Sequence, residues 1–197
     1  MGKPGSGKGT QAELFKSVLE KDHPHVMHIT TGGSFREFMK GDSFMSRRTT
    51  EVQNAGLLQP EFLSIWNWCS VLINNLKEDT TVILDGAPRK VLEVEAMHEV
   101  FPFLQYGRPV VLHVEVSDEW AIDRQTYRAS IEHRPDSSSE EKIRERLNEF
   151  KKHIVPCLEI LQKDDRYDFI HINGEQTVEE VHAELMSKLK LLEAKGK

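Results

Sequence analysis

The segment at residues 2–10 constrains the fold of this chain more than any other part of the sequence. It reads Gly-Lys-Pro-Gly-Ser-Gly-Lys-Gly-Thr, and a helical pattern follows at once. Closely spaced glycines let backbone N–H groups point into one small space, and the beginning of a helix adds unpaired N–H donors and the positive end of its dipole. Lys8 can then reach the outer phosphates of a ligand, as in the Walker A pattern. The segment predicts a phosphate-binding loop, although Gly9 follows the lysine and the usual hydroxyl comes one residue later, at Thr10.

A parallel sheet is predicted from short apolar runs that alternate with helical patterns. Such runs are typical of strands buried on both faces. Their alternation with helices predicts an α/β fold, with helices on both faces of the sheet. The longest helical stripe begins at Ser138 and continues to Leu161, and Pro156 is expected to bend it. The four expected strands lie at 25–29, 81–84, 109–116 and 169–172.

The composition fits an ordinary globular protein. Apolar residues make up 38% of the 197 residues and charged residues 29%, which argues against a disordered or collagen-like chain. The net charge of −6 does not favour nucleic acid as a partner. No apolar stretch approaches the roughly 20 residues that cross a bilayer, and no secretory pattern stands at the start. Cys69 and Cys157 are too few for a disulfide framework or a four-cysteine zinc site. We therefore expect one domain over residues 1–197, a cytoplasmic monomer that binds neither nucleic acid nor membrane.

A second polar motif, Asp85-Gly86-Ala87-Pro88-Arg89, stands at the end of the second expected strand. A carboxylate at the carboxyl end of a buried strand, opposite a phosphate-binding loop, is placed to hold Mg²⁺ directly or through water. Arg89 follows where a second phosphate could lie. Transfer between two phosphates needs positioned cations, because the transition state spreads negative charge over equatorial oxygens. Candidates for this role come later in the chain, at Arg124, Arg128, Arg134 and Arg146.

These motifs, in this order, resemble those of the adenylate kinase family of nucleoside monophosphate kinases. Residues 2–11 are similar to its glycine-rich signature, and residues 85–89 to its Asp-Gly-Phe-Pro-Arg. The resemblance covers nearly the whole chain. It implies a P-loop NTPase fold of three layers (α/β/α) with a parallel sheet, a helical monophosphate-binding excursion at 30–59 and a short lid at 125–136. Further matching segments are 30–36, 55–60, Arg124 with Arg128, Arg134 with Asp136, and Ile143 with Arg146 and Leu147.

The resemblance also implies a reaction and a set of site residues. The reaction is transfer of the γ-phosphate of ATP to a nucleoside monophosphate with Mg²⁺, which Asp85 would organise through water. The residues implied to stabilise the moving phosphoryl group are Lys8, Arg89, Arg128, Arg134 and Arg146. Those implied to bind ATP are Gly5, Ser6, Gly7, Lys8, Gly9, Thr10, Arg128 and Gln176. Those implied to bind the monophosphate are Thr31, Arg36, Leu57, Leu58, Gln59, Gly86, Ala87, Pro88, Arg89, Glu93, Arg134 and Arg146.

One departure from the family pattern bears on the base of the acceptor. Glu93 stands where the family has a glutamine that reads adenine. A carboxylate only accepts hydrogen bonds, so it suits the two adjacent donors of guanine better than the mixed edge of adenine. Thr31, by contrast, is the residue that adenylate kinases keep at its position. AMP is therefore the first expectation, and CMP, UMP or GMP the alternative.

Other departures leave open a protein that binds nucleotides without catalysis. Gly33 and Ser137 replace aspartates of the family, and Ala87 replaces an aromatic residue. The family also carries a buried apolar strand before the loop, whereas only Met1 precedes it here. Burial of about five apolar side chains at roughly 1.5–3 kcal/mol each is comparable to the ~5–15 kcal/mol net stability of a domain. We therefore expect the true start to lie upstream of Met1.

Overall fold

All four expected strands are present, close to their predicted positions. The computed structural model describes residues 1–132 and 139–195. The strands are β1 (His25–Thr30), β2 (Thr80–Asp85), β3 (Val110–Glu115) and β4 (Asp168–Asn173). β1 pairs with β2 and β3 pairs with β4, both in parallel. The predicted α/β class with parallel strands is confirmed.

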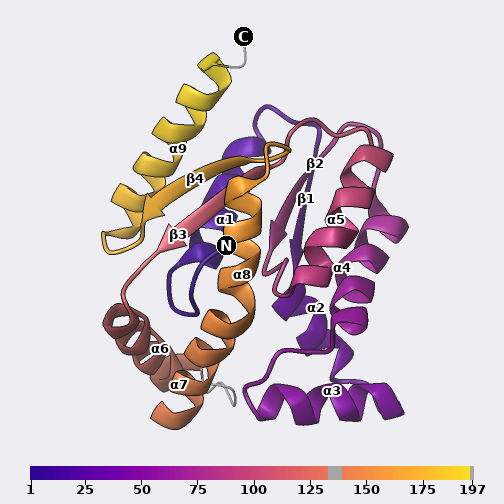
Figure 1. The fold of residues 1–197 in the computed structure, drawn as a ribbon, viewed down its shortest axis with the longest axis vertical. Coiled ribbons are helices and arrows are strands. Elements are labelled where there is room, and N and C mark those ends of the chain that lie inside the picture. The colour runs from indigo at the N-terminus through magenta and orange to yellow at the C-terminus, as the bar shows by residue number, and fades with distance from the viewer. Residues whose placement is uncertain (133–138, 196–197) are drawn as a thin grey trace.

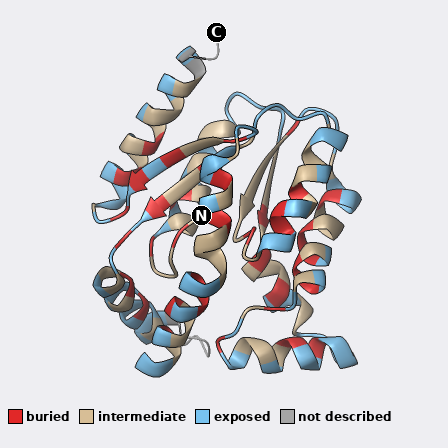
Figure 2. Ribbon diagram, in the orientation of Figure 1, coloured by how far each residue is buried: buried red, intermediate tan, exposed pale blue. Residues whose placement is uncertain are grey.

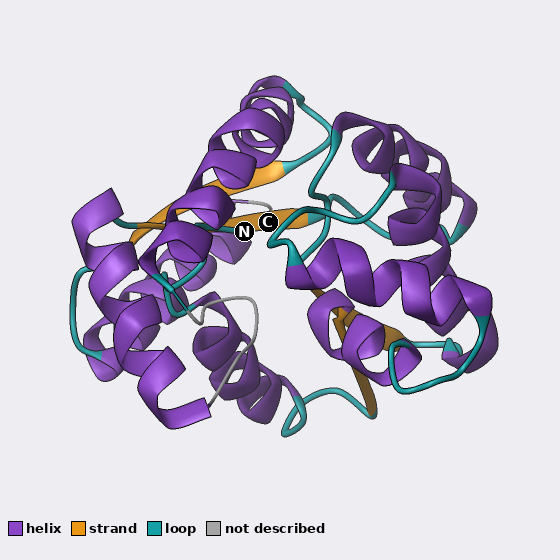
Figure 3. Ribbon diagram, turned by 90° about the horizontal axis from the view of Figure 1, so that it is seen from below, coloured by secondary structure: helices purple, strands orange, loops and turns teal. Residues whose placement is uncertain are grey.

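Helices separate the strands in sequence and lie on both sides of them (Figures 1 and 3). α4 and α5 pack on β1 and β2, α8 contacts β4 from the same side, and α1 and α9 contact each other on the opposite side. This gives the three-layer arrangement. The helices are α1 (Lys8–Leu19), α2 (Thr31–Phe38), α3 (Phe44–Asn54), α4 (Glu61–Asn75), α5 (Val91–Phe103), α6 (Asp118–Glu132), α7 (Glu140–Glu149), α8 (Val155–Lys163) and α9 (Val178–Lys195).

The core consists of apolar clusters on the two sides of the strands, visible as buried positions on facing elements in Figure 2. On one side, Trp68 of α4 and Met97 of α5 pack with Ile29 of β1. On the other side, Ile172 of β4 packs with Leu185 of α9. Each strand is therefore covered by apolar side chains of a helix, as expected for parallel strands. Among the described residues, no helix combines the length and the apolar character that a bilayer crossing requires.

The glycine-rich loop is attached to β3. The backbone N–H of Val114 donates to the carbonyl of Met1 at 2.9 Å, and the amino group of Met1 donates to the carbonyl of Leu112. Lys3 continues this attachment, because its Nζ donates to the carbonyl of Val116 at 2.6 Å. Within the described chain, β2 and β3 do not pair with each other, so the strands form two pairs.

The predicted long helix is present in three parts. A wide turn of π-helix, η2 (Phe150–Ile154), separates α7 from α8 just before Pro156. The N–H of Val155 donates to the carbonyl of Phe150, five residues back, which widens the coil where the proline ring would otherwise crowd a carbonyl. The cap of α7 is Ser139, whose side chain accepts from Lys142 N–H. The predicted start at Ser138 is therefore wrong by one residue, and Ser138 itself lies outside the described residues.

Candidate active site

The glycine-rich loop leads directly into α1, which begins at Lys8. Gly5 and Gly7 have φ angles of 88° and 83°, a region that residues with a side chain rarely adopt. A Cβ atom at Gly5 would also lie 2.7 Å from the carbonyl oxygen of Ala121. Glycine is therefore required at this close approach, and the N–H groups at the start of α1 are placed to bind an anion.

Lys8 lies among the other charged groups predicted for the site. Its Nζ donates to the carbonyl of Lys3 at 3.3 Å. Removal from water lowers the pKa of Lys8 to about 8, an effect that the Asp85 carboxylate opposes. The positive charges of Arg89, Arg146 and Arg128 also lower this pKa. The structure thus brings these predicted residues together, and their shared positive charge favours a polyanion.

The turn after β2 folds around Gly86, which has a φ of 89°. A Cβ at this position would lie 2.5 Å from Oγ1 of Thr31. That hydroxyl donates to the carbonyl of Gly86 at 2.9 Å, and Nε of Arg89 donates to the same carbonyl at 2.6 Å. The two bonds orient the guanidinium of Arg89 and connect the turn to the start of α2.

Two guanidinium groups approach the same point near the start of α2. A Cβ atom at Gly32 would lie 3.4 Å from Nη1 of Arg36 and 3.9 Å from Nη2 of Arg89. Two like charges near one point favour a multiply charged anion at that point. Because the guanidinium fork matches phosphate oxygens in pairs, the arrangement suits a phosphate group of a second substrate.

A pocket lies between the glycine-rich loop, the end of α3 with the loop that follows it, the turn after β2, and α7 with η2. Residues from all four segments face it, so it is the place where two bound phosphates could meet. The predicted residues that line it are Lys8, Leu57, Leu58, Gly86, Ala87, Pro88, Arg89 and Arg146. Its other lining residues are Met1, Gly2, Pro4, Gln53, Gly56, Glu149, Phe150 and Ile154.

Three further residues were predicted to bind substrate: two do not line the pocket and donate hydrogen bonds to the backbone, and one lies outside the described residues. Gln59 is buried and donates through its amide to the carbonyl of Thr49 at 2.9 Å, which holds the end of α3. Gln176 donates to the carbonyl of Asn173 at 2.9 Å, within the loop that precedes α9. Arg134 lies outside the described residues. The substrate-binding roles of these three residues stay predictions.

Comparison with known proteins identifies the family. The adenylate kinase family model matches residues 1–166. Adenylate kinase 1 of a Nostoc species is 30% identical over 189 residues, which cover 96% of each chain. The adenylate kinase of Thermobifida fusca is 31% identical over 193 residues, again 96% of each chain. The chain belongs to the adenylate kinase family. It is therefore a phosphotransferase with a phosphate group as acceptor, a nucleoside monophosphate kinase.

Glu149 lines the pocket of this adenylate kinase family member, although the sequence patterns did not indicate this residue. It is buried, and its Oε2 accepts the backbone N–H of Leu58 at 3.1 Å. The contact connects the loop after α3 with the end of α7, so it fixes one wall of the pocket. In the sequence Glu149 is one of many charged residues at 140–152, next to Phe150 of the apolar stripe, so no pattern singles it out.

Gly33 departs from the pattern of the adenylate kinase family for a local steric reason. A Cβ at this position would lie 2.3 Å from Oγ1 of Thr30. Gly33 is inside α2, and the residue at the N-terminal cap of that helix is Thr30. The aspartate of the family would not fit at this position unless the side chain of Thr30 moved.

Glu93 is almost fully buried, with 1% of its surface exposed, and it does not line the pocket. Its Oε1 accepts the backbone N–H of Arg89 at 3.2 Å. Burial raises the pKa of Glu93 from 4.5 to about 7, although the N–H and the charge of Arg89 favour the ionised form. Glu93 thus supports the turn that carries Arg89.

We expect Glu93→Gln to remove a pH dependence of stability. Because its pKa is raised on folding, the folded protein binds more protons than the unfolded chain between about pH 4.5 and 7, and stability falls as pH rises through this window. The glutamine keeps the acceptor for Arg89 N–H. Urea unfolding should be measured for both proteins at pH 5 and at pH 8. The free energy of unfolding of the variant relative to the wild type should be roughly 2 kcal/mol higher at pH 8 than at pH 5. A difference that does not change with pH would contradict the raised pKa.

Proposed function

We propose that this enzyme transfers the γ-phosphate of ATP to AMP and releases two molecules of ADP. The observation that carries the proposal is that Lys8, Arg89 and Arg146 line one pocket, and the positive charge of Arg128 also acts on Lys8 and lowers its pKa. An oxygen of the AMP phosphate attacks the γ-phosphorus, and the bond from that phosphorus to the β-phosphate oxygen breaks. The four cations stabilise the charge that spreads over the oxygens during transfer.

The two substrates bind on different sides of the pocket in this proposal. The backbone N–H groups at 5–10 and Lys8 hold the ATP phosphates, with Arg128 and Gln176 as further ATP contacts. Arg36 and Arg89 bind the AMP phosphate at the point near Gly32. The remaining monophosphate contacts are Thr31, Leu57, Leu58, Gln59, Gly86, Ala87, Pro88, Arg134 and Arg146, and Glu93 acts indirectly through the turn that carries Arg89.

The carboxylate of Asp85 fits a role in holding Mg²⁺. Its Oδ2 lies 3.5 Å from the position of a Cβ at Gly9, at the beginning of α1. A hard oxygen donor beside the phosphate loop is the type of ligand that Mg²⁺ prefers, often through water. When bound, the ion supplies charge neutralisation on the ATP phosphates. We further propose that residues 30–59 and the lid at 125–136 close over the substrates and exclude water, which would otherwise compete as acceptor.

A second candidate function keeps the reaction and changes the acceptor to GMP. The favouring observation is the carboxylate at Glu93, which would suit the adjacent donors of guanine. Against it, this carboxylate is already bonded to Arg89 N–H and lies outside the pocket lining. CMP and UMP are the remaining acceptors. The cytoplasmic, monomeric state stays a prediction from the sequence.

A panel of acceptors tests the proposal directly. Purified protein is incubated with ATP, Mg²⁺ and one of AMP, GMP, CMP or UMP, and diphosphate formation is measured by chromatography. We expect turnover to be fastest with AMP. If turnover is faster with GMP, CMP or UMP than with AMP, that nucleotide is the acceptor and the proposal of AMP is wrong. Binding of ATP and AMP by calorimetry, with no diphosphate formed, would support a nucleotide-binding protein without catalysis.

A further inference from the structure

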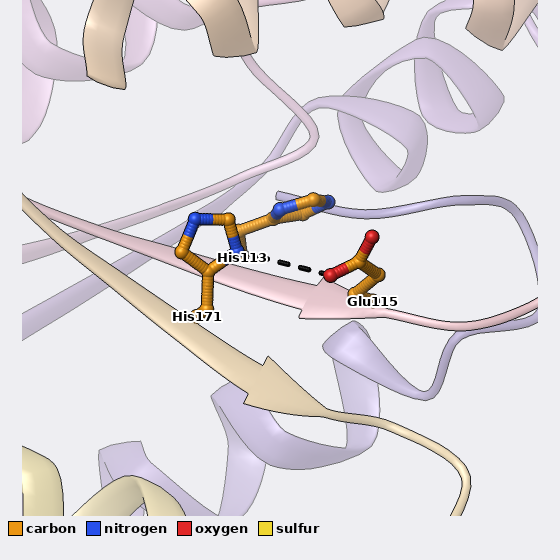
Figure 4. Close-up of side chains that lie close together, drawn as sticks. All are labelled: His113, Glu115 and His171. Carbon is orange, nitrogen blue, oxygen red and sulfur yellow. Dashed lines mark ion pairs between the residues drawn. The ribbon is translucent and has the colours of Figure 1, made fainter. Parts of the chain in front are cut away.

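Two histidines and a glutamate lie together on β3 and β4, and none of them lines the pocket (Figure 4). The register places His113 of β3 opposite His171 of β4. Glu115 follows His113 by two residues, so it projects from the same face of the strand. The opposite face of these strands carries the apolar residues that pack on α9. The three polar side chains therefore share one side of the strand pair.

The distances between these side chains suit a bound metal ion. One ligand atom from each residue can be chosen so that all three lie within 4.8 Å of one another. Nδ1 of His171 is 3.8 Å from Oε2 of Glu115, too far for a hydrogen bond. Ligand atoms at about 2.1 Å from a tetrahedral ion are roughly 3.4 Å apart. Small side-chain rotations are enough to bring the three ligand atoms to this spacing. Glu115 and His171 are exposed to solvent.

The hydrogen bonds around the cluster leave it able to coordinate. Nδ1 of His113 is buried and has no hydrogen-bond partner among the described residues, an arrangement that costs about 1–3 kcal/mol. Nε2 of the Gln162 amide lies 3.2 Å from Nε2 of His171. A half-turn of the amide exchanges its nitrogen and oxygen, so that the oxygen accepts Nε2–H of His171 and the lone pair of Nδ1 is left for a metal ion. Such an outer hydrogen bond is the usual way in which a metal-binding histidine is oriented.

We propose that His113, Glu115 and His171 bind a divalent transition-metal ion of the zinc type. Two imidazoles with one carboxylate favour Zn²⁺ and its neighbours, whereas Mg²⁺ and Ca²⁺ need more oxygen ligands. Three protein ligands leave a coordination position for water. The ion connects adjacent strands, so it stabilises the pairing of β3 with β4. The site is separate from the phosphate-transfer pocket and does not depend on the proposed acceptor.

Zinc titration of the protein without a histidine tag and without nucleotides tests this site. The protein is first treated with a chelator, and ZnCl₂ binding is followed by calorimetry. We expect one equivalent of Zn²⁺ to bind and to raise the melting temperature. His171→Ala and Glu115→Gln should each weaken binding about tenfold or more and remove most of the rise in melting temperature. Co²⁺ should give visible absorption typical of a tetrahedral site in the wild type only.

His25→Ala is the matched control. His25 is an exposed histidine of β1, next to His23 and His28 in a second histidine-rich segment. Its exchange should leave the affinity for Zn²⁺ unchanged. His113 is partly buried, so His113→Ala can fail to fold, but the exposed positions 115 and 171 carry the test without it. Binding that survives both exposed variants, binding lost in His25→Ala, or no binding at millimolar Zn²⁺ would overturn the proposal.

Discussion

Lys8→Ala is expected to lower kcat/KM for diphosphate formation by about 10²–10³-fold. The reason is that Lys8 supplies a positive charge where negative charge develops on the transferred group, in a site partly removed from water. Loss of one such donor raises the barrier by about 3–4 kcal/mol. Steady-state kinetics should place most of the loss in kcat, since the interaction is stronger in the transition state than with bound substrate.

Lys190→Ala provides the control for this experiment. Lys190 is an exposed lysine on α9 and does not line the pocket. The same change of side chain there should leave kcat and KM unchanged. Unfolding curves of the two variants should both resemble that of the wild type, so that lost activity reports the site and not the fold. Equal activities of the two variants would contradict the assignment of Lys8.

Trp68→Ala is expected to give the largest loss of stability, about 3–5 kcal/mol. The side chain of Trp68 has no exposed surface, and it packs in the cluster that contains Ile29 and Met97. Its removal leaves a cavity between α4, α5 and β1. A loss of this size is a large part of the ~5–15 kcal/mol that a domain has in total. Urea unfolding should show it as a shift of the midpoint.

Trp66→Ala is a matched control on the same helix. Trp66 is 46% exposed, and its ring contacts Phe38 at a centroid distance of 5.2 Å. Loss of this contact should cost only about 1 kcal/mol. Two tryptophans separated by two positions thus differ because one faces the core and the other the solvent. Similar midpoint shifts for the two variants would contradict the assigned burial.

Local signals predicted the secondary structure well. The strand expected at 109–116 appears as Val110–Glu115, because β-branched residues favour a strand and the inner valines Val111 and Val114 are buried in it. The loop at 2–10 and the turn at 85–89 were recognisable because each needs glycine at fixed positions, which the φ angles of Gly5 and Gly86 confirm. Pro156 was expected to bend the long helix, and the structure has a π-turn just before it, which the sequence did not predict.

Contacts between segments distant in sequence were not predictable in the same way. The resemblance placed Glu93 in the monophosphate site, but the bond from Arg89 N–H to its carboxylate could not be foreseen from the sequence. The bond from Leu58 N–H to Glu149 joins residues that are 91 positions apart. His113 and His171 become neighbours only through the register of two strands. A sequence pattern contains no information on these pairings unless the three-dimensional arrangement is known.

The π-turn before Pro156 affects the chemical environment of the pocket. Phe150 and Ile154, which begin and end this turn, both line the pocket, while Pro156 does not. The turn next to this proline thereby places two apolar side chains, Phe150 and Ile154, in the wall of the pocket. Apolar side chains in the wall lower the local dielectric constant, and this strengthens the attraction between charges and dipoles inside the pocket. The turn before Pro156 therefore influences the electrostatics of the pocket as well as the course of the helix.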